Sequence, residues 1–383
     1  MPLKGIRVIE MAGLAPAPFC GMILADFGAS VIRVDKIMPS IQTFDCLGNG
    51  KKSISIDLKT KKGADVLRKL CDQNDVLIDP FRKGVMEKLS LGPKELMNRN
   101  KRLIYARLTG FGQHGPYSTM AGHDINFLAL SGLLSLFGRH GEKPTPPINL
   151  AADFGGGGLM CTLGIILALF ERNQSNMGQI IDASMVEGSA YLGSWFYRSR
   201  EIPGLWGQPR GKNLLDTGAH FYDTYQTKDG KYMSVGAIEP QFYNILLEKL
   251  ELSDNEVPQF EKFEENRIKL AEKFKEKTQE EWCAIFDGTD ACVIPVLSLE
   301  EAPHHSHNKH NESFLLQKQD SAVPKPAPRL SRSPGASCVM RGPHLIPGEN
   351  SVEILKEYNF DSTEINDLIS QNIIKQRKTQ AKL

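Results

Sequence analysis

The fold is decided near the N-terminus, where residues 6–35 read IRVIEMAGLAPAPFCGMILADFGASVIRVD. A short apolar run, a Pro/Gly loop, an apolar helical pattern and a second apolar run follow one another at residues 6–9, 13–18, 19–27 and 31–34. Parallel strands need a crossover connection, which is usually a helix. The stretch therefore predicts a βαβ unit, and the first expectation is an α/β fold with a Rossmann-like parallel sheet.

The loop of this unit is informative about cofactors. Residues 13–18 read GLAPAP and lack the Gly-x-Gly-x-x-Gly fingerprint that opens dinucleotide-binding units. The sequence therefore argues against a bound nicotinamide or flavin dinucleotide.

Strands and helices continue to alternate after this unit. An alternating strand at residues 51–59, a helix at 63–71 and two buried strands at 76–78 and 103–108 extend the α/β pattern to about residue 185. Gly- and aromatic-rich sequence follows, then a strand at residues 231–238, a helical pattern rich in Glu and Lys, and a stretch dense in Pro, Ser and Gly. We expect a large Rossmann-like domain at residues 1–187, a linker at 188–224, a smaller α+β domain at 225–315, a return linker at 316–350 and a C-terminal helical segment at 351–383 that rejoins the large domain.

Composition limits the partners. The chain has 383 residues, 41% of them hydrophobic and 24% charged, with a net charge of +1. Such a charge does not indicate a nucleic-acid partner, so an anionic ligand would be held by local basic groups. Seven cysteines without a C-x-x-C pair favour reduced thiols in an intracellular compartment. No uninterrupted apolar run reaches membrane-spanning length, so no membrane span is expected.

A histidine and a carboxylate stand on two polar breaks beside apolar segments. Residues 121–126 read AGHDIN and contain His123, and residues 149–158 read NLAADFGGGG and contain Asp153. The second break is expected to open a helix at residues 159–171. Because a histidine and a carboxylate on rigid elements suit proton transfer, and helix N-termini favour developing negative charge, these breaks form a candidate site.

Structural explanations remain open for the same groups. His123 is also explained as a satisfied core histidine, Asp153 as the N-cap of the following helix, and the four glycines at residues 155–158 as a packing loop. The histidine-rich stretch at residues 304–310 lacks a cysteine partner and regular ligand spacing, which favours a solvated helix start over a zinc site.

Three motifs resemble the type III CoA-transferase superfamily, and in particular its racemase branch. They lie at residues 122–126, at 149–158 and at 235–242, where the chain reads VGAIEPQF. Further matches at residues 13–16, 25–29, 104–107 and 286–292 extend the resemblance over essentially the whole chain.

The resemblance implies a fold, an assembly and a reaction. The fold would be a large Rossmann-like CoA-binding domain with a smaller α+β domain, in two chains that interlock as a homodimer. The reaction would interconvert (2R)- and (2S)-alpha-methyl-branched acyl-CoA thioesters, feeding branched-chain fatty acids and bile-acid intermediates to β-oxidation. The CoA thioester would be the substrate, with no metal and no redox cofactor.

The resemblance also assigns roles to single residues. His123 and Asp153 match the two groups that exchange a proton on opposite faces of the substrate. Glu239 matches a glutamate that comes from the partner subunit and pairs with the histidine. Substrate and CoA contacts are implied for Lys36, Ser55, Ile56, Asp57, Leu58, Lys59, Lys88, Gly122, Asp124, Ile125, Asn126 and Asn149.

This chemistry sets physical requirements. Inverting a carbon beside a thioester carbonyl needs an acid/base group on each side of an enolate plane. Asp153 must be protonated to donate, so its pKa should be raised by burial or by a neighbouring negative charge such as Glu239. Backbone N–H groups of Asp124, or of residues 155–158, are expected to hold the enolate oxygen. CoA phosphates are expected to meet lysines near strand ends, which are Lys36, Lys51, Lys52, Lys59 and Lys88.

The chain departs from the family pattern at a few positions. Phe127 replaces a tyrosine, and Thr217 and His220 interrupt a segment that is commonly Gly-Gly-Ala-Pro, which is expected to alter the acyl pocket. One alternative is a CoA-transferase of the same superfamily, in which Asp153 attacks as a nucleophile, although transferases lack the histidine at position 123. A second alternative is an acyl-CoA-binding dimer without turnover.

The C-terminal tripeptide Ala381-Lys382-Leu383 is a conservative variant of the S-K-L peroxisomal address. We therefore expect recognition by the peroxisomal import receptor, with the mitochondrion as a second location.

Overall fold

The computed structural model describes residues 1–37, 46–317, 321–336 and 345–377. The tripeptide Ala381-Lys382-Leu383 lies outside the described residues, so its predicted role is not addressed by the structure.

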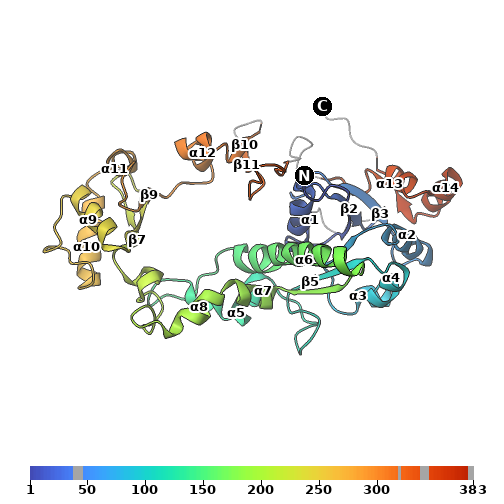
Figure 1. Ribbon diagram of the computed structural model, residues 1–383, viewed down its shortest axis with the longest axis horizontal. Coiled ribbons are helices and arrows are strands. Elements are labelled where there is room, and N and C mark those ends of the chain that lie inside the picture. The colour runs from blue at the N-terminus through green and yellow to red at the C-terminus, as the bar shows by residue number, and fades with distance from the viewer. Residues whose placement is uncertain (38–45, 318–320, 337–344, 378–383) are drawn as a thin grey trace. The chain divides into compact units, whose positions relative to one another are not determined.

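The chain folds into two compact units, each built from separate stretches of sequence (Figure 1). Unit 1 comprises residues 1–133, 147–193 and 325–383, and unit 2 comprises residues 134–146 and 194–324.

Unit 1 is built on a seven-stranded sheet with the order β12-β3-β2-β1-β4-β5-β6. Every neighbouring pair is parallel except β12, which runs antiparallel to β3. The order 3-2-1-4-5-6 of the parallel strands is that of a doubly wound Rossmann-type sheet, so the predicted α/β class is confirmed. The strands are β1 (Arg7–Met11), β2 (Ser30–Asp35), β3 (Lys52–Ile56), β4 (Val76–Asp79), β5 (Ile104–Thr109), β6 (Ile180–Ser184) and β12 (Ile374–Lys375).

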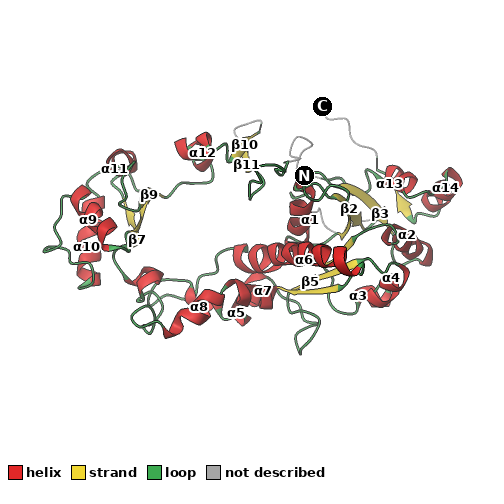
Figure 2. Cartoon of the chain, viewed as in Figure 1, coloured by secondary structure: helices red, strands yellow, loops and turns green. Residues whose placement is uncertain are grey.

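Two groups of helices cover this sheet, as Figure 2 shows. One group, which includes α2, α4, α13 and α14, shares a single apolar core with the strands, and the other includes α1 and α6. Because helices cover the sheet, its central strands are almost continuously buried, with β4 and β5 buried at every residue. The helices are α1 (Pro16–Asp26), α2 (Lys61–Cys71), α3 (Val85–Lys88), α4 (Pro93–Arg99), α5 (Asp124–Leu130), η2 (Leu150–Leu159), α6 (Met160–Ser175), α7 (Met185–Leu192), α13 (Ser351–Glu357) and α14 (Ser362–Ser370).

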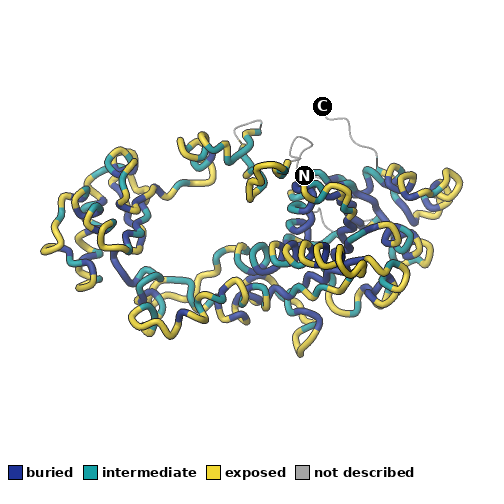
Figure 3. Tube along the Cα trace, viewed as in Figure 1, coloured by how far each residue is buried: buried dark blue, intermediate teal, exposed yellow. Residues whose placement is uncertain are grey.

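One helical segment, Leu150–Ser175, is long and apolar enough to cross a membrane by length and composition alone. It joins η2 to α6, and it packs on α1, α7, β5 and β6. Figure 3 shows buried and exposed residues alternating along α6. We therefore interpret the segment as a core helix of unit 1 whose outer side is apolar.

Unit 2 contains an antiparallel sheet of β7 (Tyr222–Gln226), β8 (Tyr232–Gly236) and β9 (Val293–Pro295). Its core joins aromatic side chains of this sheet and its helices, among them Phe221, Tyr225 and Trp282. The predicted strand at residues 231–238 and the helical pattern after it are confirmed. The other elements are α8 (Ser194–Arg198), η3 (Ser199–Glu201), η4 (Leu214–Gly218), α9 (Pro240–Lys249), α10 (Phe263–Phe274), α11 (Gln279–Phe286), η5 (Ala302–His304), α12 (Ser306–His310), β10 (Phe314–Leu316) and β11 (Ala322–Pro324), while η1 (Leu133–Leu136) crosses the boundary between the units in sequence.

Candidate functional site

His123 is placed by the start of α5. It is the exposed residue directly before the helix, and its backbone N–H donates to Oδ1 of Asn126 at 3.0 Å. The N–H of Asn126 in turn donates to the carbonyl of His123 at 2.8 Å. The polar break at residues 121–126 is therefore an ordered helix start that holds the His123 backbone at two points.

Asp124 connects this helix start to the segment that carries Asp153. Its side chain is only 5% exposed, and Oδ1 accepts the backbone N–H groups of Ala152 at 2.8 Å and Asp153 at 2.7 Å. These donors belong to the first turn of η2, where helical N–H groups have no partner within the helix. A carboxylate at that position is a favourable cap. The residue next to His123 thus fixes the backbone of Asp153, and the structure brings the two candidate groups together.

The surroundings of the Asp153 carboxyl shift its pKa. Burial, followed by the negative charge of Asp124, raises the pKa of the half-buried Asp153. A hydrogen bond with Asn149 and the nearby His123 act in the opposite direction. The predicted rise is confirmed, but within unit 1 the negative neighbour is Asp124 rather than Glu239.

The helical segment η2 bears on two interpretations of the second polar break, which are Asp153 as a helix cap and residues 155–158 as a turn. Asp153 lies inside this helical segment and Asn149 occupies its N-cap position, so the explanation of Asp153 as a helix cap is wrong. The four glycines at residues 155–158 are also helical rather than a turn, which weakens the prediction that their N–H groups hold the enolate oxygen. They are needed for packing, because a Cβ on Gly156 would lie 2.5 Å from Oγ of Ser189 and a Cβ on Gly158 would lie 2.7 Å from the carbonyl of Pro16.

Phe127 supports the loop that precedes His123. Its buried ring lies 5.0 Å from the ring of Phe111, and added Cβ atoms on Gly110 and Gly122 would lie 2.1 and 2.7 Å from it. The side chain that departs from the family pattern is therefore packed against the loop backbone. Glycines at positions 110 and 122 permit this close approach, which sequence periodicity does not reveal.

The predicted Glu239 lies in unit 2. It is the exposed residue directly before α9, which begins at Pro240. Its charge contributes, after burial, to a raised pKa of the nearby Cys292. The structure therefore groups His123, Asp124, Asn149 and Asp153 in unit 1, whereas Glu239 belongs to unit 2.

The residues predicted to bind CoA gather by topology. Lys36 directly follows β2, residues 57–59 directly follow β3, and Lys88 ends α3 after β4. The carboxyl ends of parallel strands lie at one edge of the sheet, where ligands of this sheet type bind. Lys36, Lys59 and Lys88 are exposed there.

Other predicted contacts are not available at that edge. The side chains of Ser55 and Ile56 are buried, so neither presents its side chain at this edge, and their predicted contact with CoA stays a prediction. Lys51 is fully buried, with Nζ 2.8 Å from Oε2 of Glu10, and the prediction that it meets phosphates is wrong. Lys52 is ion-paired with Glu353 and Glu357 of α13, which neutralise its charge.

His220 is also a core residue rather than part of a pocket wall. Its ring has no exposed surface, and Nε2 lies 2.7 Å from the hydroxyl of Tyr243. Thr217 has a left-handed backbone with φ of 76°, and its carbonyl accepts a hydrogen bond from Arg267 at 2.6 Å. The structure therefore places His220 in the core of unit 2, and the expectation that Thr217 and His220 alter the acyl pocket stays a prediction.

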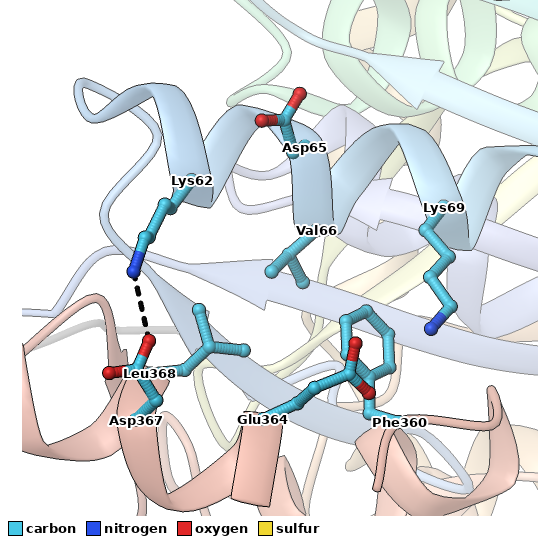
Figure 4. A pocket seen from close by; sticks show the side chains of 8 residues that line it. All are labelled: Lys62, Asp65, Val66, Lys69, Phe360, Glu364, Asp367 and Leu368. Atoms are coloured by element: carbon cyan, nitrogen blue, oxygen red, sulfur yellow. Dashed lines mark hydrogen bonds and ion pairs between the residues drawn. The ribbon is translucent and has the colours of Figure 1, made fainter.

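A pocket of about 320 Å³ between α2 and α14 lies apart from these residues (Figure 4). Lys62 pairs with Asp367 across it at 2.9 Å, and Lys69 lies 3.6 Å from the ring centroid of Phe360. No predicted site residue lines it. Across the described part of the chain, no group of three His, Cys, Asp or Glu side chains is arranged to hold a metal ion.

Comparison with known proteins decides the family. Residues 3–346 match CoA-transferase family III. The chain belongs to this family. Within CoA-transferase family III it is similar over its whole length to the proteins named Alpha-methylacyl-CoA racemase from Mus musculus and Homo sapiens, with 55% and 54% identity and full coverage of both chains in each case.

Solved structures agree on the fold. A CAIB/BAIF family protein from Brucella suis superposes with a TM-score of 0.78 and 22% identity, covering 94% of this chain and 100% of that one. At this identity the likeness supports the fold alone. The full-length relatives confirm the resemblance drawn from the three sequence motifs.

Proposed function

We propose that this family III chain is an isomerase that interconverts (2R)- and (2S)-alpha-methylacyl-CoA thioesters. The observation that carries the proposal is the group formed by His123, Asp124 and Asp153, in which one carboxylate caps the turn that bears the other. The full-length similarity to two racemases supports the same reaction.

The mechanism follows from the two acid/base groups. His123 removes the alpha proton on one face, because a histidine exchanges protons near neutral pH. Asp153, whose raised pKa favours the protonated form, donates on the opposite face of the enolate. In the reverse direction the roles exchange. The N–H of Asp124, at the first position of α5, is the proposed donor to the enolate oxygen, since helical N–H groups there lack an acceptor within the helix.

A CoA-transferase is the second candidate, because the family includes that activity by name. It would require Asp153 to attack the thioester as an ionised carboxylate. The neighbouring charge of Asp124 and burial both disfavour the ionised form. The direction of the pKa shift therefore favours proton donation by Asp153 over attack as a carboxylate.

The proposal includes the CoA site and the dimer. Lys36, Lys59 and Lys88 would meet the phosphates at the carboxyl edge of the sheet. The outer side of α6 would face a second copy of this chain, because it presents a continuous exposed apolar stripe that is unfavourable in water. The stripe begins at Leu159, the last residue of η2, and continues along α6 with Leu163, Ile166, Leu167 and Phe170. In the dimer, Glu239 of one chain would approach His123 of the other.

The proposal also includes the cellular role. We place the reaction in the peroxisome on the basis of Ala381-Lys382-Leu383, with the mitochondrion as a second location, and its products enter β-oxidation. Loss of peroxisomal import on deletion of the tripeptide is the corresponding test.

Isotope exchange tests the reaction. Purified protein is incubated with one enantiomer of an alpha-methylacyl-CoA in heavy water, and the products are resolved by enantiomer and by deuterium content. The expected result is the opposite enantiomer with deuterium at the alpha carbon. Asp153→Asn and His123→Ala should each reduce inversion by about 100-fold or more, because each group is a general acid/base.

The single variants sharpen the test. Each should retain exchange without inversion for the enantiomer whose proton faces the remaining group. His114→Ala, an exposed histidine outside the site, is the matched control and should behave as wild type. Absence of both inversion and exchange in the wild type, or trapping of an Asp153 acyl group by hydroxylamine, would replace the racemase by the alternatives.

A further inference from the structure

Arg107 makes an unusual connection near the carboxyl edge of the sheet. It lies close to the end of β5, opposite Asp79 at the end of β4. Its guanidinium donates from Nη1 to Oε1 of Glu87 at 2.8 Å and from Nη2 to Oε2 of Glu87 at 3.3 Å. Its Nε faces Oδ2 of the fully buried Asp79 at 3.7 Å. The buried guanidinium therefore links the ends of two strands to a residue of α3.

The helix α3 needs such a connection. It has four residues, too few to be stable alone, and it follows Gly84, whose φ of 86° sets the direction of the turn. Met86 anchors one side of it in the apolar core. The two-point contact of Glu87 with Arg107 anchors the other side, and planar two-point pairs fix orientation more closely than single contacts do.

The position of Glu87 is informative because it is electrostatically unfavourable for binding an anion. The next residue, Lys88, is exposed and has no ion-pair partner within the described residues, as expected of a phosphate ligand. A negative charge beside it would weaken phosphate binding if charge were the only effect. Arg107 neutralises that charge and lowers the pKa of Glu87, against the effect of partial burial.

We propose that the Glu87–Arg107 pair is a clamp that positions Lys88 and the turn at residues 82–88 for the phosphates of the CoA thioester. The inference rests on the proposed function and extends it to two positioning residues. Neither residue touches the reacting carbon, so the clamp sets affinity for the nucleotide part of the substrate and leaves proton transfer unchanged.

Glu87→Gln is the decisive variant, because Glu87 is partly exposed and its replacement keeps the side-chain shape. The clamp predicts that the Kd for free CoA and the KM for acyl-CoA both rise by about fivefold, with kcat changed less than about twofold. With an acyl-pantetheine thioester, which lacks the nucleotide phosphates, the variant should equal the wild type. Glu95→Gln, an exposed glutamate of α4 with the same change of charge, is the matched control and should leave all three values unchanged.

Other outcomes overturn the clamp. If Glu87→Gln binds CoA more tightly than the wild type, the negative charge of Glu87 only weakens phosphate binding, and the clamp is wrong. An equal loss with acyl-CoA and acyl-pantetheine would show a general structural effect. If the wild type inverts acyl-CoA but Glu87→Gln binds CoA normally, the clamp fails and the proposed function stands. If the wild type binds CoA without inversion, a raised Kd in the variant supports the clamp while the racemase proposal fails. A wild type that does not bind CoA overturns both.

Discussion

Acidification below pH 6.5 is expected to destabilise unit 2 through His220. The ring is fully buried, and its Nε2 faces the hydroxyl of Tyr243, which itself donates to the carbonyl of Val257 at 2.8 Å. The Tyr243 hydrogen is therefore used, and Nε2 must donate to the tyrosine oxygen. Nδ1 is buried without a hydrogen-bond partner. A second proton on this ring would place a charge in the core with nothing to accept its hydrogen bond.

The magnitude follows from the pKa. Burial, and then the positive charge of Arg267, lowers the pKa of His220 from 6.5 to about 4. Because the unfolded chain binds the proton more tightly, the stabilisation is complete above pH 6.5 and is lost as the pH falls towards 4. The full loss corresponds to about 3 kcal/mol, of which about 2 kcal/mol is lost by pH 5.

Urea denaturation followed by tryptophan fluorescence measures this loss. The three tryptophans of the chain, Trp195, Trp206 and Trp282, all lie in unit 2, so the signal reports that unit. His220→Gln keeps an N–H donor for Tyr243 but does not titrate, and other groups contribute equally to both proteins. Between pH 7 and pH 5 the wild type should lose about 2 kcal/mol more than the variant. Equal losses in the two proteins would refute the reasoning.

Two further changes test the link between α5 and η2. Asp124→Asn keeps an oxygen for the two N–H groups of η2 but removes the charge, so the pKa of Asp153 should fall. The alkaline limb of the kcat/KM profile should therefore move to lower pH. If this limb does not move, the charge of Asp124 does not have this role. Gly188→Ala would place a Cβ 1.9 Å from the carbonyl of Gly156, so α7 and η2 must separate, with an expected loss of about 1–3 kcal/mol in thermal unfolding and loss of inversion. Gly236→Ala, whose Cβ meets only ordinary contacts at 3.8 Å, should unfold like the wild type.

Local patterns were sufficient to predict five of the seven strands in the sheet of unit 1, all except β6 and β12. The apolar runs at residues 6–9, 31–34, 76–78 and 103–108 coincide with β1, β2, β4 and β5, because strands buried on both faces have continuous apolar sequence. The strand β12 was not predicted. It has two residues, and its pairing with β3 depends on chain segments more than 300 residues apart, which no local pattern records.

The candidate site was predicted in part. The residue types of His123 and Asp153 indicated acid/base chemistry, but NLAADFGGGG was interpreted as a polar break before a helix at residues 159–171, and four glycines do disfavour a helix. Close packing of those glycines against neighbouring segments outweighs this propensity, and η2 begins at Leu150. Lys51 was misassigned for a related reason, since only the tertiary structure shows that Glu10 is buried beside it.

Asp124 shows why the position and the protonation of Asp153 are coupled in this chain. The oxygen that accepts the N–H of Asp153 belongs to the carboxylate whose charge raises the pKa of Asp153. A displacement of η2 away from α5 would therefore loosen Asp153 and also weaken the effect of Asp124 that raises its pKa. Because Asp124 directly follows His123, the same displacement would separate the two proton-exchanging groups. Geometry and protonation thus depend on one contact, and Asp124→Asn separates them by removing the charge while keeping the hydrogen bonds.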